Sequence, residues 1–300
     1  MRVARYSALD WWTRPDFGSE DGRAAADKTQ YKPLHRGDPD RPGHFEMVVT
    51  RYPVPKSVPR HRHAHDQLRY TLAGSSPWSP ENSTPTGSLL YIPSGTAYGP
   101  YERPTDIELL SIEFEGANRA PFLDIDTLHE AHQRLAARGR FEGNVYHWVD
   151  EAGEPQKLNA RRARELEALG FVPQPPHPRF ATPIEIDPDR FGGTLIAGRT
   201  AIRHLVAFEE SGTAISMLSL EVEATHGYTA RGTELMFVTA GSGEMSGTRL
   251  SERDAVHLES ENVAIESETG LEMLVLRLPR PVDTTQETIE EEGNARQPAA

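Results

Sequence analysis

Two histidines stand two residues apart in the segment RHRHAHDQLRYTLAG, which covers residues 60–74. On an extended strand His61 and His63 would point to the same face, because successive side chains alternate between the two faces. Gln67 follows after a short turn and carries an amide oxygen. Two imidazoles on one strand face, with an oxygen ligand from the next strand, form an arrangement able to hold a divalent first-row metal ion.

A second segment, GSLLYIPSGTAYG at residues 87–99, completes a pattern. The two segments resemble the two motifs of the cupin superfamily, G-x5-H-x-H-x(3,4)-E-x6-G and G-x5-P-x-G-x2-H. The matching residues are His61, His63 and Gly74 in the first motif and Gly87, Pro93 and Gly95 in the second. The chain departs from the motifs at three positions, where Pro55 replaces Gly, Gln67 replaces Glu and Tyr98 replaces His.

The resemblance implies a metal ion held by His61 and His63, with Gln67 at the third ligand position and Tyr98 at the fourth. The amide oxygen of Gln67 can coordinate as a carboxylate would. Tyr98 leaves three roles open: a phenolate ligand, a catalytic proton donor beside the metal, or a position left to water, substrate or dioxygen. With no charged ligand the metal keeps its full charge, which favours an anionic, chelating substrate. We expect one divalent ion per chain, Fe(II) first, with Zn, Mn and Ni as alternatives.

Three neighbouring residues are further candidates. His65 shares the strand parity of His61 and His63, so it is either a catalytic acid/base or substitute ligand, or an exposed turn histidine before Asp66. Arg69 and Tyr70 are candidate substrate-binding residues, and one of the two should face inward. An inward Arg69 would suit a substrate carboxylate.

Short strands bounded by turn residues must position these side chains. In the first half they are FEMVVTRY, QLRYTLAG, SLLYIPSG and IELLSIEFEG, between residues 45 and 116. In the second half they are TAISMLSLEVEA, TELMFVTAGSGE, DAVHLES and LEMLVLRL. Between the halves, IDTLHEAHQRLAARG and LNARRARELEALG have apolar residues at helical spacing, and EGNVYHWVDEAGEP is typical of a hairpin or loop.

The two halves resemble copies of one unit. A single offset aligns Gln67 with Glu234, Gly74 with Gly241 and Gly87 with Asp254. At the same offset Tyr228 and Ala230 replace the two histidines. The second copy is therefore predicted to hold no metal.

The resemblance predicts a mainly β fold with two tandem cupin barrels, of the double-stranded β-helix or jelly-roll type, joined by a mostly helical connector. The expected segments are an N-terminal extension (1–43), the first barrel with the metal site (44–116), the connector (117–180), the degenerate second barrel (181–281) and a disordered acidic tail (282–300). The extension is expected to pack along a barrel or across a neighbouring subunit. Cupin barrels often pair, so the resemblance also implies a homodimer.

Composition excludes several kinds of chemistry. The chain has no cysteine, which excludes disulfides, zinc–thiolate sites, iron–sulfur clusters and cysteine nucleophiles. Its 45 acidic and 32 basic side chains give a formal net charge of −13, which repels phosphate backbones and anionic lipids. No signal-peptide core or membrane-length apolar run is present. We therefore expect a cytoplasmic protein whose partner is a small molecule rather than nucleic acid or a membrane.

Three functions are consistent with these features. The first is an oxidoreductase of the cupin dioxygenase type, in which Fe(II) with few protein ligands leaves positions for a chelating substrate and dioxygen. The second is a non-redox isomerase, lyase or dehydratase, in which the metal polarises a carbonyl while Tyr98 or His65 moves a proton. The third is a non-catalytic small-molecule-binding cupin.

Overall fold

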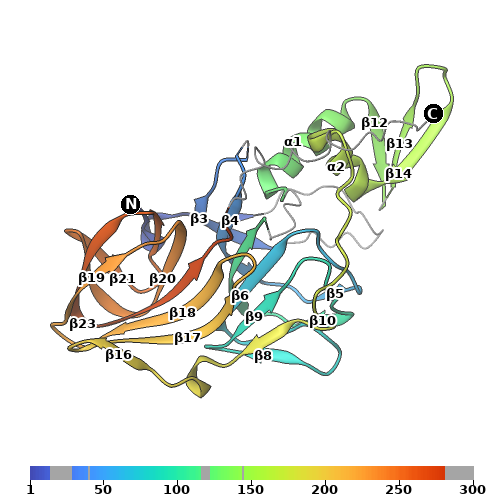
Figure 1. Cartoon of the computed structure of the whole chain (residues 1–300). Helices are drawn as coiled ribbons and strands as arrows, with labels where there is room; N and C mark the ends of the chain where they lie inside the picture. The colour runs from blue at the N-terminus through green and yellow to red at the C-terminus, as the bar shows by residue number, and fades with distance from the viewer. Residues whose placement is uncertain (14–28, 40, 116–121, 144, 281–300) are drawn as a thin grey trace, which may run out of the picture.

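The computed structural model describes residues 1–13, 29–39, 41–115, 122–143 and 145–280 and is mainly β (Figure 1). The predicted tail at 282–300 lies outside these residues. The eight strands expected from sequence all form. In the first half they are β4 (Phe45–Tyr52), β6 (Asp66–Ala73), β9 (Leu89–Ile92) and β11 (Ile107–Phe114). In the second half they are β18 (Thr213–Leu220), β20 (Thr233–Met245), β22 (Ala255–Glu259) and β23 (Asn262–Arg277).

The chain forms two large antiparallel sheets with the same strand order. The first sheet runs β15-β9-β6-β11-β4-β3-β2, where β15 is Ile184–Ile186, β3 is Gln30–Arg36 and β2 is Trp12–Thr13. The second runs β1-β22-β20-β23-β18-β17-β16, where β1 is Arg2–Ala4, β17 is Thr200–Phe208 and β16 is Thr194–Ala197. Each position in one order has a counterpart in the other, as expected for two copies of one unit.

Each sheet takes its first strand from the opposite half of the chain. Strand β1 pairs with β22 of the second sheet, through registers such as Val3 with Val256. Strand β15 pairs with β9 of the first sheet, through Glu185 with Leu90. The sequence-based boundaries at 43 and 181 are therefore corrected: β1 and β3 are sheet strands rather than an extension, and β15 belongs to the first sheet. Backbone hydrogen bonds of β1 and β15 thus link the two halves of the chain.

The two sheets pack against each other through one apolar core. In Figure 1 the second sheet, drawn mostly yellow to red, lies beside the first, drawn mostly blue to green. Strand β4 shows the alternation that produces this packing. Its side chains in the core between the sheets are Phe45, Met47 and Val49. Those on its other face, toward an interior pocket, are Glu46, Val48 and Thr50. The second sheet contributes Phe237, Leu274 and Leu276 to the shared core.

The second half curls around an apolar interior. The start of β23 pairs with β19 (Thr225–Thr229) and its end with β18, while β21 (Thr248–Ser251) pairs with β20. The enclosed side chains are apolar, among them Met236, Val238 and Met273. Glu234, at the position that aligns with Gln67, is fully buried and pairs with Arg277 at 3.0 Å. Its other oxygen accepts a hydrogen bond from Tyr228 at 2.5 Å, so Glu234 is held within the fold.

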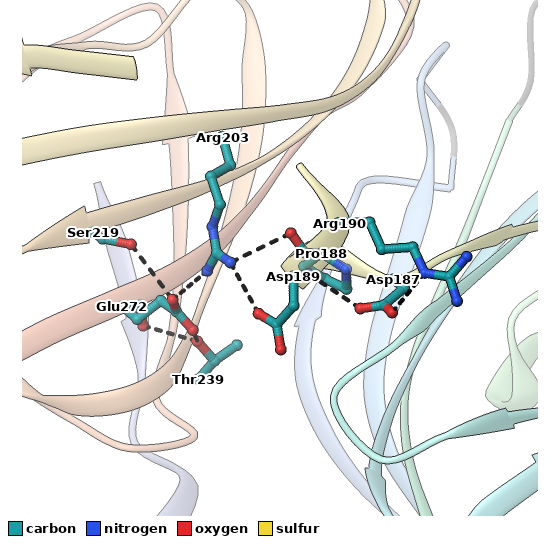
Figure 2. A network of polar contacts seen from close by, with 8 residues as sticks. All are labelled: Asp187, Pro188, Asp189, Arg190, Arg203, Ser219, Thr239 and Glu272. Atoms are coloured by element: carbon teal, nitrogen blue, oxygen red, sulfur yellow. Dashed lines mark hydrogen bonds and ion pairs between the residues drawn. The ribbon is translucent and has the colours of Figure 1, made fainter. Parts of the chain in front are cut away.

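A polar network secures the crossover into the second half. The short 3-10 helix η2 (Pro188–Arg190) follows β15. Arg203 of β17 reaches from Glu272 Oε2 at 2.5 Å to Asp189 Oδ1 at 3.1 Å and the carbonyl oxygen of Pro188 at 3.3 Å (Figure 2). Glu272 also accepts hydrogen bonds from Ser219 and Thr239 (Figure 2). Arg203 and Glu272 thus join the crossover segment to four strands of the second sheet, β17, β18, β20 and β23.

The connector combines two helices with a small sheet. Helices α1 (Ile125–Ala136) and α2 (Ala160–Leu169) form where sequence predicted them, and Gly170 ends α2 in the left-handed conformation. The predicted hairpin is β13 (Val145–Val149) with β14 (Pro155–Asn159), and β12 (Gly139–Glu142) extends it to three strands. This unit projects from the first sheet (Figure 1). Neither helix, nor any other in the described part of the chain, is long and apolar enough to cross a membrane.

Candidate metal centre

The candidate site is a pocket on the face of the first sheet that points away from the second sheet. Its cavity measures about 240 Å³. The floor consists of inward-facing side chains of β4, β6 and β11, and the opposite wall includes β5 (Lys56–Val58) and β10 (Tyr101–Arg103). Apolar side chains of α1 and the preceding segment, including Phe122, Ile125 and Leu128, complete the wall. The hairpin of β7 (Ser75–Pro77) and β8 (Ser83–Pro85) lies outside this lining.

Backbone pairing places His61 opposite Tyr98. The two residues exchange two backbone hydrogen bonds of 3.0 Å, and their rings lie 4.2 Å apart. Two residues on, the carbonyl of His63 accepts a 2.8 Å hydrogen bond from Gly95 N. A Cβ atom at Gly95 would lie 2.3 Å from the Pro176 carbonyl oxygen, so this motif position requires glycine. The motif residues therefore bring the two histidines and Tyr98 to one place.

The two motif histidines are neutral imidazoles. Burial lowers the pKa of His61, and it lowers the pKa of His63 strongly, with His65 and His61 adding repulsion. The His61 Nδ1–H donates to the carbonyl oxygen of Pro59 at 2.8 Å, which leaves Nε2 as the ring atom with a lone pair. The rings of His61 and His63 lie 5.1 Å apart and nearly perpendicular. A backbone-anchored neutral imidazole is typical of a metal ligand.

The hydroxyl group of Tyr98 lies at the centre of the site. Arg69 Nη2 donates to it at 2.8 Å, and it lies 3.0 Å from His63 Nε2 and 3.5 Å from Gln67 Oε1. Because Arg69 occupies the phenol oxygen as a donor, the phenol proton is directed to His63 or Gln67. Burial raises the pKa of Tyr98, against the lowering effect of Arg69, so the group is a neutral phenol.

Glu113 is a site residue that the sequence analysis missed. It lies opposite Gln67 in the β6–β11 register and opposite Glu46 in the β11–β4 register. Gln67 Nε2 donates to Glu113 Oε1 at 2.5 Å, which turns the amide oxygen of Gln67 toward Tyr98. His65 Nε2 lies 3.2 Å from Glu113 Oε2. Burial raises the pKa of Glu113, but His65, Arg69 and Arg161 outweigh it and lower the pKa, so Glu113 is a carboxylate.

Of the three other candidate residues, two line the pocket and one faces the opposite side of the sheet. His65 is buried and lines the pocket between Glu113 and Phe122, whose ring centroid lies 4.8 Å away, so it is not an exposed turn histidine. Arg69 faces the pocket. Tyr70 packs instead against the core between the sheets, because it occupies the opposite strand face. Tyr70 therefore does not line this pocket, and its substrate-binding role stays a prediction.

The donor set of the pocket fits a divalent metal ion with few protein ligands. Within the described residues no three His, Cys, Asp or Glu side chains converge to hold a metal by themselves. A metal here would therefore depend on His61, His63 and the amide oxygen of Gln67. A second hydrogen bond orients the side chains of His61 and Gln67, and backbone pairing with Gly95 places His63. Neutral imidazole and amide oxygen suit first-row divalent ions.

Comparisons with known proteins agree with this fold. No family model and no curated protein sequence matches the chain. A protein of Nostoc punctiforme described as a candidate dioxygenase superposes with a TM-score of 0.57 at 12% identity, over 94% of this chain and 83% of its own. HEPD of Streptomyces albus, solved with its substrate 2-hydroxyethylphosphonate and Fe(II), gives a TM-score of 0.56 at 11% identity, over 94% and 77%.

Bacillus subtilis oxalate decarboxylase, a protein with Mn(II) centres, gives a TM-score of 0.53 at 11% identity, over 93% of this chain and 77% of its own. These neighbours are cupin-type proteins, and each superposition covers both halves of this chain. At such low identity the likeness establishes the fold: the chain has the cupin fold. The chemistry of its pocket must be argued from its own residues.

Proposed function

We propose that the chain is a metal-dependent enzyme that acts on a small, anionic, chelating substrate in the pocket of the first sheet, as an oxidoreductase of the dioxygenase type. The observation that supports this most is the convergence of two neutral imidazoles and an oriented amide oxygen around the hydroxyl of Tyr98. A bound Fe(II) ion would supply open coordination positions for the substrate and dioxygen. The second half, with its apolar interior, is proposed as a degenerate barrel that supports the first.

The chain's own residues would prepare the substrate. Arg69 holds the oxygen of Tyr98 and presents a cationic guanidinium to the cavity. The phenol of Tyr98 can donate its proton to an atom that replaces His63 as acceptor. The apolar wall of α1 and the preceding segment, with Phe122, Ile125 and Leu128, limits water at the site. Substrate binding, proton donation and the exclusion of water would thus come from β6, from the segment after β9 and from the wall that includes α1.

A non-redox reaction, such as isomerisation or elimination, is the second candidate function. The observation that favours it is the number of groups that can move a proton: the phenol of Tyr98 and the His65–Glu113 pair both face the cavity. In this reaction the metal would only polarise the substrate, and Zn, Mn or Ni would serve as well as Fe.

Oxygen consumption separates the two reactions. Metal-free protein would be loaded separately with Fe(II), Mn(II), Ni(II) and Zn(II) and given a panel of small 2-hydroxy, 2-oxo and aromatic acids. The proposal predicts oxygen uptake with Fe(II), its loss in His63→Ala, and no change in the control His226→Ala on β19. Substrate turnover without oxygen uptake and with Zn(II) would select the non-redox reaction. Affinity without turnover under any of the four metals would reject both in favour of a binding protein.

A further inference from the structure

Two guanidinium groups of the pocket contact phenols rather than carboxylates. Arg69 donates to Tyr98 Oη at 2.8 Å. Arg103 of β10 stacks over the ring of Tyr52 with its Cζ 3.9 Å from the centroid, and its Nη2 lies 3.5 Å from Tyr101 Oη. Both arginines line the cavity.

Two partly buried arginines of the second half are neutralised within the fold. Arg277 pairs with buried Glu234 at 3.0 Å, and Arg203 pairs with Glu272 at 2.5 Å. Among the described residues Arg69 and Arg103 have no carboxylate within ion-pairing distance. Phenols and ring faces meet part of their hydrogen-bonding capacity, but neither guanidinium, one on the floor of the pocket and one on the opposite wall, has an ion-pair partner in the described part of the chain.

The charge balance of the cavity is positive although the whole chain carries a net charge of −13. Arg161 of α2 also lines the cavity but pairs with Glu165 at 2.7 Å, so the positive balance rests on Arg69 and Arg103. Of the two carboxyl groups there, only Glu113 is a carboxylate, because burial beside Glu113 raises the pKa of Glu46 to about 8; one negative charge thus faces two unpaired guanidiniums. Burial raises the pKa of Tyr101, yet Arg69 and Arg103 outweigh it and lower the pKa, as a positive local potential requires.

We propose that Arg69 and Arg103 form an anion-binding subsite, and that the ligand of the pocket is a small organic acid whose carboxylate lies between the two guanidiniums while its other end faces His61 and His63. The assignment of the His61–His63 end rests on the proposed function, whereas the Arg69–Arg103 end stands on its own contacts. A carboxylate would accept charge-assisted hydrogen bonds from both arginines. The cavity of about 240 Å³ is below the roughly 300–1,000 Å³ of pockets for drug-sized ligands, so the acid is small.

The test measures anion binding in metal-free protein, by calorimetry and thermal shift, with malonate, succinate, benzoate and inorganic phosphate as probes. We expect at least one carboxylate to bind, and the neutral malonamide not to bind. Arg69→Met and Arg103→Met each keep an apolar stem and remove the charge. Each should weaken binding about 10- to 100-fold, as expected for losing a hydrogen bond between charged groups. Arg249→Met, which removes an exposed arginine of the second half, is the matched control and should bind as the parent does.

A second readout separates a ligand subsite from a structural role. Without ligand, Arg103→Met should melt at the same temperature as the parent or above it, because repulsion from Arg69 is relieved. If Arg103 had a structural role instead, this substitution would lower the melting temperature. No carboxylate binding across the panel, equal binding of malonamide, or unchanged affinity in both arginine variants would overturn the proposal. The anion-binding measurements use metal-free protein and would be repeated with His61→Ala/His63→Ala. If the proposed metal site is wrong, the anion-binding result should therefore be unchanged. Phosphate binding alone would reject the carboxylate assignment.

Discussion

Glu46 is a buried carboxyl group that the fold keeps protonated at neutral pH. Burial is the main cause, the charge of Glu113 adds to it, and Arg36 at 3.3 Å opposes both, giving a pKa of about 8. Because this value lies above the ordinary 4.5, the folded protein retains a proton that the unfolded chain releases. The stabilising contribution is therefore complete below pH 4.5 and is lost as the pH rises through about 8.

Glu46→Gln should consequently raise the melting temperature at pH 8 by about 2–4 °C and leave it unchanged near pH 4.5. Glutamine imitates the neutral acid and cannot ionise. Thermal unfolding followed by circular dichroism between pH 4.5 and 8.5 checks this, with exposed Glu102→Gln as control. A melting temperature that falls equally with pH in parent and variant would contradict the buried, neutral state of Glu46.

At the residue level, sequence predicted the part of the site that lies in one segment. His61, His63 and Gln67 are close in sequence, so strand parity and motif spacing were sufficient to group them. Glu113 and Arg103 joined the pocket through strand pairing, β11 with β6 and β10 with β5, which no local spacing encodes. A signal was present in IELLSIEFEG, where Ser111 and Glu113 alternate with apolar residues. That alternation predicts an inward polar face once a closed β fold is assumed.

At the level of elements, α1 supplies a wall of the pocket and is held at its N-terminus by Asp124. The carboxylate accepts hydrogen bonds from Thr127 N at 2.9 Å and Thr127 Oγ1 at 3.1 Å. His44 Nε2 lies 3.3 Å away and Arg36 3.6 Å away. Burial raises the pKa of Asp124, but these partners outweigh it and lower the pKa to about 2. The stabilising contribution is thus present above pH 3.8 and lost as the pH falls through about 2.

Asp124→Ala should destabilise the protein by about 1–2 kcal/mol and speed amide hydrogen exchange in α1. Asp124→Asn keeps the capping acceptor and should restore most of the exchange protection. Hydrogen exchange resolved by mass spectrometry measures both. Unchanged protection of residues 125–136 in Asp124→Ala would show that another contact holds the helix.

A clear apolar pattern, more than length, explains which elements the sequence predicted, because β3 with seven residues and β17 with nine were not predicted. Strands of four residues or more with a clear apolar pattern, such as β6 and β18, and the two helices, were found with nearly correct limits. Strands β1 and β15 have three residues each, too few to show a period. Their exchange between sheets depends on tertiary pairing alone.

For the whole molecule, the shared core and the exchanged edge strands predict that the two halves unfold together. Leu276 of the second sheet is fully buried in the core that also contains Phe45 and Met47 of the first. All four tryptophans lie before residue 150, so their fluorescence reports on the first half and the connector. Leu276→Ala should lower the melting temperature followed by tryptophan fluorescence as much as that followed by circular dichroism.

The expected cost of Leu276→Ala is about 2–5 kcal/mol, the usual range for deleting a buried leucine side chain. Leu195→Ala, on the exposed edge strand β16, is the control and should change neither transition. Two separate transitions, with the fluorescence transition unaffected, would mean that the halves are energetically independent despite their common core.

The central claim, that the first half holds one divalent metal ion through His61, His63 and Gln67, is tested most directly by metal content. Protein purified without chelator or affinity-tag metal would be analysed by mass spectrometry beside His61→Ala/His63→Ala and the control His226→Ala. We predict about one equivalent of divalent metal per chain in the parent and the control, and less than about a tenth of that in the double variant. Little metal in the parent even after reconstitution, or equal metal in the double variant, would contradict the claim.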